Sequence, residues 1–248
     1  MAELTVDDLH LTYGDNPILK GVSLTLNRGE VVSLLGPSGS GKTTLLRAVA
    51  GLETPHQGTI RIGDKVVFDG AARADIPAEG RNLGLVFQSY ALWPHKTVHD
   101  NVAYGLKLRK IPGAEIGTRV KTALEQLSLG HLGERFPHQL SGGQKARVGI
   151  ARAIALKPDL IILDEPTAAL DVSVQAVVLN LLQDLKDSLG MSYLFVSHDL
   201  NVVRLLCDRV IVMQTGQIVE HGPTERVMGA PEAAYTRDLL AAIPHPPV

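Results

Sequence analysis

Alternating apolar and polar residues predict strands near both ends of the chain. The alternation covers residues 4–13 and 19–26, joined by a turn-forming Gly-Asp-Asn-Pro sequence, and residues 210–214 and 217–221, which flank a Thr-Gly pair. A period of two is typical of half-buried strands, and the short connections favour antiparallel pairing. We therefore expect an antiparallel β region at the N-terminus and a hairpin late in the chain.

Apolar runs and helical periodicity occupy the sequence between these regions. Short apolar runs predict buried strands at residues 31–35, 83–87, 160–165 and 193–196. Capping residues and apolar positions three or four residues apart predict helices at residues 97–109, 115–129 and 145–156, after residue 171, and at 231–243. This order predicts an α/β fold with a mixed sheet core, an N-terminal antiparallel β subdomain and an inserted helical subdomain.

Composition excludes several classes of protein. Lys and Arg number 24 against 26 Asp and Glu, which does not favour a protein that neutralises many nucleic-acid phosphates. A single cysteine, Cys207, excludes an internal disulfide, and we expect it to be buried. The N-terminus is acidic, and no apolar run approaches the ~20 residues that span a bilayer, so we expect neither export nor membrane spanning.

A glycine-rich segment lies between the apolar run 31–35 and the helical run after it. It consists of Gly36, Pro37, Ser38, Gly39, Ser40, Gly41, Lys42, Thr43 and Thr44. Glycine permits the positive φ angles that turn backbone N–H groups inward around phosphate oxygens, and the helix start adds positive potential. Lys42 can reach the β- and γ-phosphates, and Thr43 offers a hydroxyl to Mg²⁺. This order favours a P-loop over a glycine-rich turn that merely ends a strand.

Two carboxylates, Asp164 and Glu165, follow the apolar run that begins at residue 160. The carboxyl ends of strands are where α/β sheets bind ligands. Two acids that shared one task would raise each other's pKa, so we expect a division of labour. Asp164 would orient the Mg²⁺ shell, as a Walker B aspartate does, and Glu165 would face the attacking water. The alternative is a pair of solvated acids at a strand end.

Three further features have both a structural and a functional interpretation. A second helix start consists of Ser141, Gly142, Gly143 and Gln144. It can bind an anion or be only a capped helix. His198 follows a buried strand and can contact the γ-phosphate or be structural, and Tyr13 can stack on adenine or be an ordinary strand aromatic.

The chain contains the motif Leu-Ser-Gly-Gly-Gln between a P-loop and Leu-Ile-Ile-Leu-Asp-Glu. With these motifs in this order, the chain resembles, from end to end, the nucleotide-binding domain of ATP-binding cassette (ABC) transporters. The resemblance implies an A-loop aromatic at Tyr13, a Q-loop glutamine near Mg²⁺ at Gln88, a D-loop aspartate at Asp171 and an H-loop histidine at His198. In that family ATP lies between two cassettes, with the P-loop of one facing the signature motif of the other. The resemblance also implies that Gln88–Lys96 receives the coupling helix of a membrane permease.

Different parts of the chain resemble different importer branches. Residues 87–105 resemble the ATPases of iron, polyamine, sulfate or sugar importers, whereas residues 169–175, 193–200 and 235–244 resemble those of di- and oligopeptide importers. The transported solute and the natural or constructed origin of this mosaic therefore stay open.

The resemblance predicts one nucleotide-binding domain over residues 1–248. Residues 1–87 and 158–248 would form the ATPase core and β subdomain, and residues 88–157 the helical signature subdomain. The expected cofactors are ATP and Mg²⁺, and the expected activity is hydrolysis of ATP to ADP and phosphate. The residues expected to act on the phosphate are Glu165, His198, Gln88 and Lys42, with Thr43, Gln88 and Asp164 around Mg²⁺.

The predicted function is that of the ATPase subunit of an ABC importer. Its expected partners are a second cassette, identical or different, a membrane permease and a solute-binding protein, and its expected place is the cytoplasmic face of the membrane. The alternative is a soluble ABC-type ATPase that acts on a protein scaffold or nucleic acid. The aromatic residues after Gln88 suit a hydrophobic partner helix and favour the importer.

Overall fold

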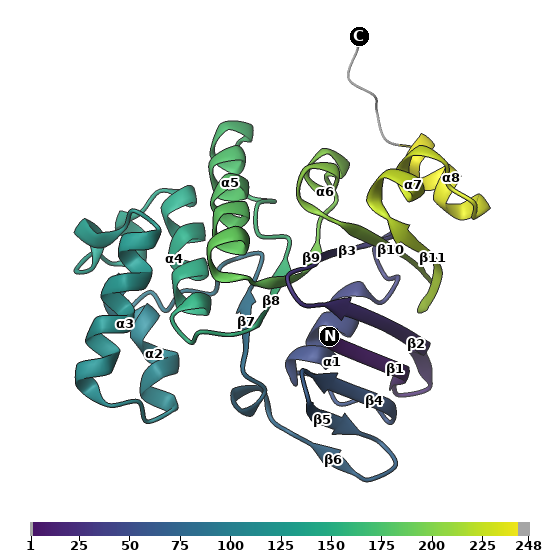
Figure 1. The fold of residues 1–248 in the computed structure, drawn as a ribbon, viewed down its shortest axis with the longest axis horizontal. Helices are drawn as coiled ribbons and strands as arrows, with labels where there is room; N and C mark the ends of the chain where they lie inside the picture. Colours follow the sequence, from purple (N-terminus) through teal and green to yellow (C-terminus); the bar gives the residue numbers. More distant parts are fainter. Residues whose placement is uncertain (1, 243–248) are drawn as a thin grey trace. The chain divides into compact units, whose positions relative to one another are not determined.

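The computed structural model describes residues 2–242, which fall into two compact units. Unit 1 extends to Arg81 and resumes at Tyr193, and unit 2 comprises Asn82–Ser192. Figure 1 shows the elements of each unit along the colour ramp. None of the helices in the described residues is long and apolar enough to cross a membrane.

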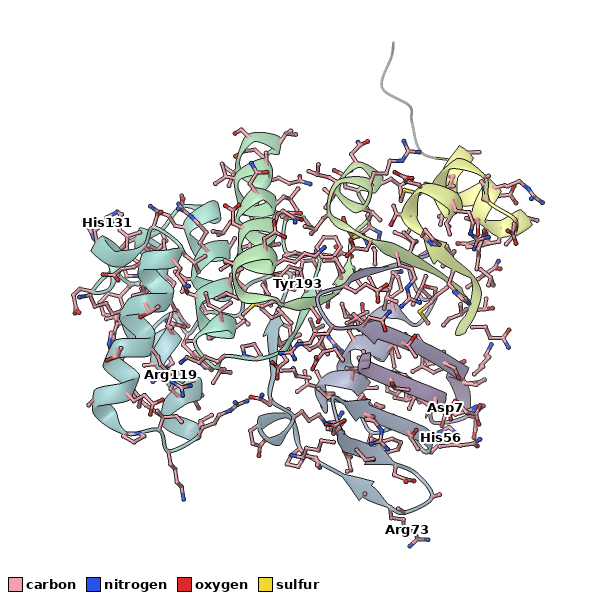
Figure 2. All side chains as sticks on the ribbon, viewed as in Figure 1. Asp7, His56, Arg73, Arg119, His131 and Tyr193 are labelled. Carbon is pink, nitrogen blue, oxygen red and sulfur yellow. The ribbon has the colours of Figure 1, made fainter. Side chains whose placement is uncertain are left out.

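An antiparallel sheet forms the N-terminal part of unit 1. Its strands, in spatial order, are β2 (Asn16–Asn27), β1 (Ala2–Tyr13), β4 (Gln57–Ile62), β5 (Lys65–Asp69) and β6 (Ala74–Asp75), with a 3₁₀ turn at Ala78–Gly80. Leu9 and Leu11 of β1 are buried, as the alternation predicts. Leu4 is buried as well, because a bulge between Val6 and Leu9, with Asp8 at a φ of 45°, shifts the alternation by one residue. Asp7, His56 and Arg73, labelled in Figure 2, all belong to this sheet or its turns.

Unit 1 also contains a mixed sheet. Its order is β11 (Gln217–Pro223), β10 (Arg209–Gln214), β3 (Val31–Leu35) and β9 (Ser192–Val196). Strands β10 and β11 pair antiparallel, whereas β3 pairs parallel with both β10 and β9. All residues of β3 and β9 are buried, including Tyr193 in Figure 2, which explains why these strands read as continuous apolar runs.

The helices of unit 1 begin and end close to these sheets. They are α1 (Lys42–Ala50), α6 (Leu200–Leu206), α7 (Thr224–Gly229) and α8 (Ala234–Ala241). Helix α7 packs on β10 and β11. Helices α6 and α7 were not predicted, because their few turns give little periodicity. The helix predicted at 231–243 is shorter, and residue 243 lies outside the described residues.

Unit 2 combines a parallel strand pair with helices. The strands are β7 (Leu83–Val86) and β8 (Leu160–Asp164), and the helices are α2 (Val98–Leu108), α3 (Gly113–Gln126), α4 (Gly142–Ile154) and α5 (Val172–Leu189), with 3₁₀ turns at Gly130–Leu132 and Pro137–Gln139. Helix α4 contacts β7, α2, α3 and α5, so it is the centre of the unit. Strand β8 ends one residue before the predicted end, which leaves Glu165 outside the strand. The predicted α/β class, mixed sheet, N-terminal β region and inserted helices are confirmed.

Candidate functional site

The glycine-rich loop of unit 1 has the backbone geometry of an anion cradle. Gly36, Gly39 and Gly41 have φ angles of 145°, 80° and 98°. Gly41 is the N-cap of α1 and provides no side-chain cap, so the first N–H groups of the helix depend on other partners. A Cβ atom at Gly39 would meet no atom within 4 Å, which leaves open space at the loop. Open space beside uncapped N–H groups fits a bound phosphate.

Lys42 folds over this loop. Its Nζ donates to the carbonyls of Gly36 and Pro37 at 2.8 Å each and to the Ser40 hydroxyl at 3.2 Å, and Lys42 is 6% exposed. The ammonium group therefore already lies at the mouth of the cradle, where it can exchange carbonyl contacts for phosphate oxygens.

Gly36 is required for a second, steric reason. A Cβ atom at this position would lie 2.1 Å from the backbone carbonyl oxygen of Met213, on β10. Because that oxygen belongs to backbone, it cannot move aside as a side chain would. The close approach between β10 and the loop thus fixes where the cradle begins.

Tyr13 lies at the end of β1, beside the first turn of α1. Partial burial, followed by the neighbouring Glu53 carboxylate, raises the pKa of Tyr13, and the Thr44 hydroxyl acts in the opposite direction. Tyr13 keeps 47% of its surface exposed. An accessible ring beside the P-loop helix fits a base-stacking role, so the structure brings these two predicted features together.

Strand register brings His198 to the same edge. Leu34 of β3 pairs with Val196 of β9, and two residues further on the strands reach Gly36 and His198. Both strands run parallel, so the exposed imidazole follows the strand end next to the phosphate loop.

In unit 2 the register of the paired strands also aligns the residues that follow them. Val86 of β7 pairs with Leu163 of β8, so the chain reaches Gln88 and Glu165 two residues beyond the pair, with Asp164 at the end of β8. The amide and the two carboxylates therefore follow the same edge of this strand pair. The sequence predicted the strand end for the two acids, and the family resemblance implied that Gln88 lies near them. A pairing of Gln88 and Asp164 with Thr43 joins residues of different units and stays a prediction.

Glu165 has an unusual backbone conformation. Its φ of 51° lies in the left-handed region, which costs a non-glycine residue about 1–2 kcal/mol. The Glu165 carbonyl accepts from Ala168 N–H at 3.2 Å, and the chain then turns to Asp171, the N-cap of α5. The left-handed residue therefore turns the chain directly after Asp164, the last residue of β8.

Asp171 accepts hydrogen bonds from the Ser173 hydroxyl at 2.6 Å and from Val174 N–H at 2.9 Å. The Ser173 bond and then the Val174 bond lower the pKa of Asp171. The predicted D-loop aspartate is therefore an exposed helix cap in this structure.

The signature segment is also a capped helix start. Ser141 Oγ accepts from Gln144 N–H at 3.3 Å, while the Gln144 side-chain oxygen accepts from Ser141 N–H at 2.9 Å. A Cβ atom at Gly143 would lie 2.4 Å from Val174 Cγ1 and one at Gly142 would lie 3.3 Å from Leu170, so the glycines permit close packing on the Asp171 region. The Gly142 and Gly143 N–H groups precede the i−4 bonds of the helix and suit an anion.

The loop after Gln88 is held by two residues that the sequence analysis missed. Arg152 of α4 donates to the carbonyls of Tyr90 and Ala91, 2.7 Å each. The fully buried Asn101 accepts from Trp93 N–H at 2.8 Å and donates to the Thr97 carbonyl at 2.9 Å. Neither role has a local sequence signal, because the partners are distant or lie on the backbone.

Arg81 is a third missed residue. Its buried guanidinium donates to the carbonyls of Ala48 and Val49, at the end of α1, at 2.7 and 2.9 Å, and pairs with Asp75 at 2.7 Å. It therefore satisfies the helix end opposite the phosphate loop. Gly51 is the C-cap of α1, and a Cβ atom there would lie 2.6 Å from Arg81 Nε, so this glycine also makes room for the side chain.

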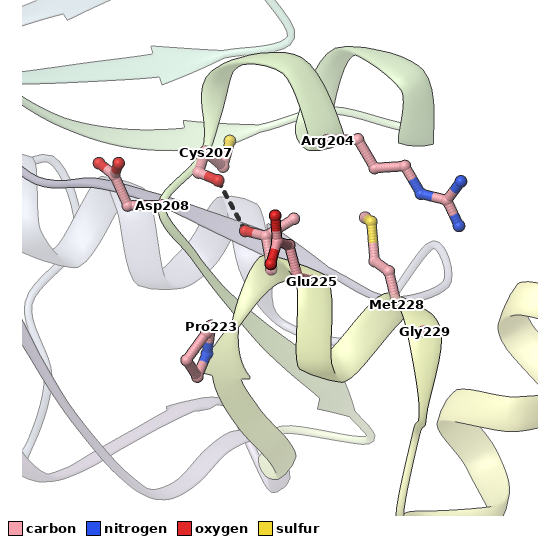
Figure 3. Close-up of a pocket in the computed structure, with 8 residues that line it drawn as sticks. Arg204, Cys207, Asp208, Pro223, Glu225, Met228 and Gly229 are labelled. Atoms are coloured by element: carbon pink, nitrogen blue, oxygen red, sulfur yellow. Dashed lines mark hydrogen bonds between the residues drawn. The ribbon is translucent and has the colours of Figure 1, made fainter.

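Unit 1 has a pocket of about 770 Å³ between α6 and α7 (Figure 3). The Thr224 hydroxyl donates to the Cys207 carbonyl at 2.7 Å at its base, and the Cys207 side chain is buried as predicted. Arg204 and Glu225 border the pocket, which contains no residue of the predicted nucleotide site.

Comparisons with known proteins agree with this geometry. A family model described as ABC transporter matches residues 19–168. The spermidine/putrescine import ATP-binding protein PotA of Mannheimia succiniciproducens is 40% identical over 235 residues, which cover 95% of this chain and 61% of that protein. The chain thus spans about three-fifths of the length of such curated relatives.

Solved structures are similar over almost their whole length. CbiO1 from Clostridium perfringens, described as part of the ABC transporter complex CbiONQ, has a TM-score of 0.81 at 34% identity, with coverage of 92% of this chain and 91% of that chain. A dimeric post-hydrolysis state of the ATP-binding cassette MJ0796, bound to ADP and Pi, has a TM-score of 0.75 at 31% identity and covers 89% and 98%.

Proposed function

The chain belongs to the ABC transporter family, and we propose that it is the ATP-hydrolysing subunit of an ABC importer. The observation that carries this proposal is the P-loop, with three glycines at positive φ, open space beside Gly39, and Lys42 hydrogen-bonded to the loop carbonyls. The importer class is supported by relatives whose names describe import ATP-binding proteins.

Residues of unit 1 would hold the nucleotide. Lys42 and the N–H groups of residues 36–44 would bind the phosphates, and Tyr13 would cover the adenine. Thr43, together with Gln88 and Asp164, would hold Mg²⁺ through the oxygen ligands that this cation prefers. Bound Mg²⁺ neutralises charge that develops on the phosphates.

Glu165 would take the proton of the attacking water. Glu165 directly follows the strand that ends at Asp164, so one acid can bind the metal while the other acts as base. His198 would contact the γ-phosphate, because its strand pairs with the strand that enters the P-loop.

Two copies of this chain would pair around the nucleotide. In the pair, Ser141, Gly142, Gly143 and Gln144 of one copy would face the phosphates bound by the other, with Asp171 beside them at the interface. The capped start of α4 supports this arrangement, since the glycine N–H groups can donate to an anion without unfolding the helix.

The loop of residues 88–96, here named the docking loop, would receive a helix of a membrane permease. Trp93 and Tyr104 pack with ring centroids 4.2 Å apart, and both are half-buried. Aromatic side chains that stay partly exposed are typical anchors of partner interfaces. A permease and a solute-binding protein would complete the importer, with this chain at the cytoplasmic face of the membrane.

The test is the turnover of the Glu165→Gln variant. We expect nucleotide binding to persist and the rate of ATP hydrolysis to fall by about 10²–10⁴-fold, the usual contribution of a positioned base. Glu134→Gln, at an exposed position of unit 2, is the matched control and should keep the unmodified rate. Normal turnover in Glu165→Gln would contradict the role of Glu165 as the base. If the unmodified chain did not bind ATP, the proposed function itself would be wrong.

Co-purification tests the importer role separately. The tagged chain should be recovered from membranes with a polytopic protein. Recovery only with soluble proteins or nucleic acid would contradict the importer and favour an ATPase of another kind.

A further inference from the structure

Helix α4 connects the signature motif with the docking loop inside unit 2. Ser141 caps its first turn, and Arg152 lies near its end. Arg152 lies eleven positions after Ser141, a separation of about 16 Å at the rise of an α-helix. The helix contacts β7, α2, α3 and α5, so a displacement of its start moves a packed element rather than a free segment.

Arg152 makes a two-point contact with strained backbone. Its two terminal nitrogens donate to the consecutive carbonyls of Tyr90 and Ala91 at 2.7 Å each. Tyr90 and Ala91 have φ angles of 60° and 44°, which are unfavourable for residues with side chains. Such a conformation persists only where surrounding contacts impose it, and the planar guanidinium supplies two of these contacts.

The same guanidinium also covers the chain's only tryptophan. Its central carbon lies 5.3 Å from the ring centroid of Trp93, within the range of a cation–π contact. Lys96 lies 5.5 Å from the Tyr104 ring, on which Trp93 packs. Arg152 therefore contacts both the turn that begins the docking loop and the aromatic residue at its centre.

The charge of Arg152 strengthens this attachment. Burial lowers its pKa, and in the described part of the chain no ion pair joins it to a carboxylate. An arginine stays charged in proteins, so a loop that moved away would leave this half-buried cation without these acceptors. Loop and helix are thus expected to move together.

We propose that Arg152 is a positioning residue that fixes the docking loop to the signature helix, so that nucleotide contact at Ser141 alters the loop through α4. The inference rests on the proposed function for its nucleotide part only. The attachment of the loop by Arg152 is a property of the chain without nucleotide.

Hydrogen exchange of the purified chain without nucleotide tests the attachment. In Arg152→Met, the amides of residues 90–97 should exchange about tenfold faster or more, the effect expected from the loss of a charge-assisted hydrogen bond. The matched control is Arg147→Met on the same helix, because Arg147 donates to the Leu127 carbonyl at 3.3 Å and has no contact with Tyr90 or Ala91 among its hydrogen bonds. Unchanged exchange in Arg152→Met, or equal acceleration in both variants, would overturn the proposal.

Trp93 fluorescence tests the coupling. In the Glu165→Gln background, ATP with Mg²⁺ should change the emission of Trp93, and Arg152→Met should abolish this response while ATP binding persists. Arg152→Lys, which keeps the charge but not the two-point contact, should respond more weakly than the arginine chain. Arg147→Met should respond normally.

The outcomes separate the two proposals. A full response in Arg152→Met, or no response of the unsubstituted background despite bound ATP, would overturn the coupling. Absence of ATP binding in that background would instead contradict the proposed function, and the exchange experiment would still decide whether Arg152 holds the loop.

Discussion

Helices α1 and α4 both begin with glycines next to an expected phosphate, yet their starts are built differently. The start of α1 has no side-chain cap, and its N-cap Gly41 is in the left-handed region. The start of α4 has a reciprocal capping box between Ser141 and Gln144. One helix start is therefore shaped by backbone conformation, and the other is closed by side chains.

This difference suits different tasks. An uncapped start, with Lys42 bound to the carbonyls of its own loop, holds N–H groups that a phosphate can satisfy. A capped start is stable by itself, so α4 can fold before a second copy presents its nucleotide. We infer that α1 binds the nucleotide first and that α4 adds to a site already filled.

The largest expected effect comes from a methyl group at the start of the phosphate loop. Gly36→Ala would place Cβ 2.1 Å from a backbone oxygen at a φ of 145°, so we expect a loss of stability of about 4 kcal/mol or more, in the exceptional range for single substitutions. Thermal unfolding measures it. Gly142→Ala, whose nearest contact would be a leucine methyl at 3.3 Å, is the control, and equal losses would contradict the contrast between the two helix starts.

Loss of the Lys42 ammonium should act on binding rather than on folding. Lys42→Met should weaken ATP affinity roughly 10- to 100-fold, because a charge-assisted hydrogen bond contributes about 1.5–3 kcal/mol. Titration calorimetry gives the affinity. Lys145→Met, next to the signature motif, should leave affinity of the single chain unchanged, and a comparable loss there would show that α4 contributes to the first binding step.

Removal of the α4 cap should act on folding rather than on binding. Ser141→Ala should lower the free energy of unfolding by about 1 kcal/mol, the usual cost of losing such a cap. Denaturant unfolding measures this change, and ATP affinity of the single chain should stay constant. A stable Ser141→Ala chain with weakened ATP binding would reverse the roles of the two helix starts.

The smallest expected effect is the pH dependence of stability at Asp171, which caps α5 with a charged side chain, whereas Ser141 caps α4 with a neutral one. The Ser173 and Val174 hydrogen bonds lower the pKa of Asp171, so its contribution to stability is present above its usual pKa near 4 and disappears as pH falls through the lowered value. The stability difference between the unmodified chain and Asp171→Asn should therefore vanish in acid, as followed by unfolding at several pH values. The difference caused by Ser141→Ala should not change with pH, and a pH-independent Asp171 effect would contradict the assigned hydrogen bonds.

The chemistry of the phosphate loop was predictable because it is local. Glycine spacing, Lys42 and the flanking apolar run lie within a short segment, and the structure confirms the loop's positive φ angles and the N-cap at Ser141. The ends of the strands were also predictable from the apolar runs. The register of the paired strands then places Gln88 and Glu165 at one strand edge, and His198 and the phosphate loop at another.

The residues that hold these segments in place were not predictable. Arg81 binds carbonyls 33 and 32 residues away, and Arg152 binds carbonyls 62 and 61 residues away. Their acceptors are backbone oxygens, which leave no mark on side-chain patterns. The strain at Glu165 was equally hidden, since the apolar run gave no sign that the strand ends at Asp164.

Light scattering of Glu165→Gln shows whether the P-loop of one copy meets the signature helix of another. With ATP and Mg²⁺ we expect a dimer, and we expect a monomer without nucleotide or when Lys42→Met or Ser141→Arg is added. A Glu165→Gln chain that binds ATP and stays monomeric, or a dimer that the Ser141→Arg substitution leaves intact, would contradict this contact.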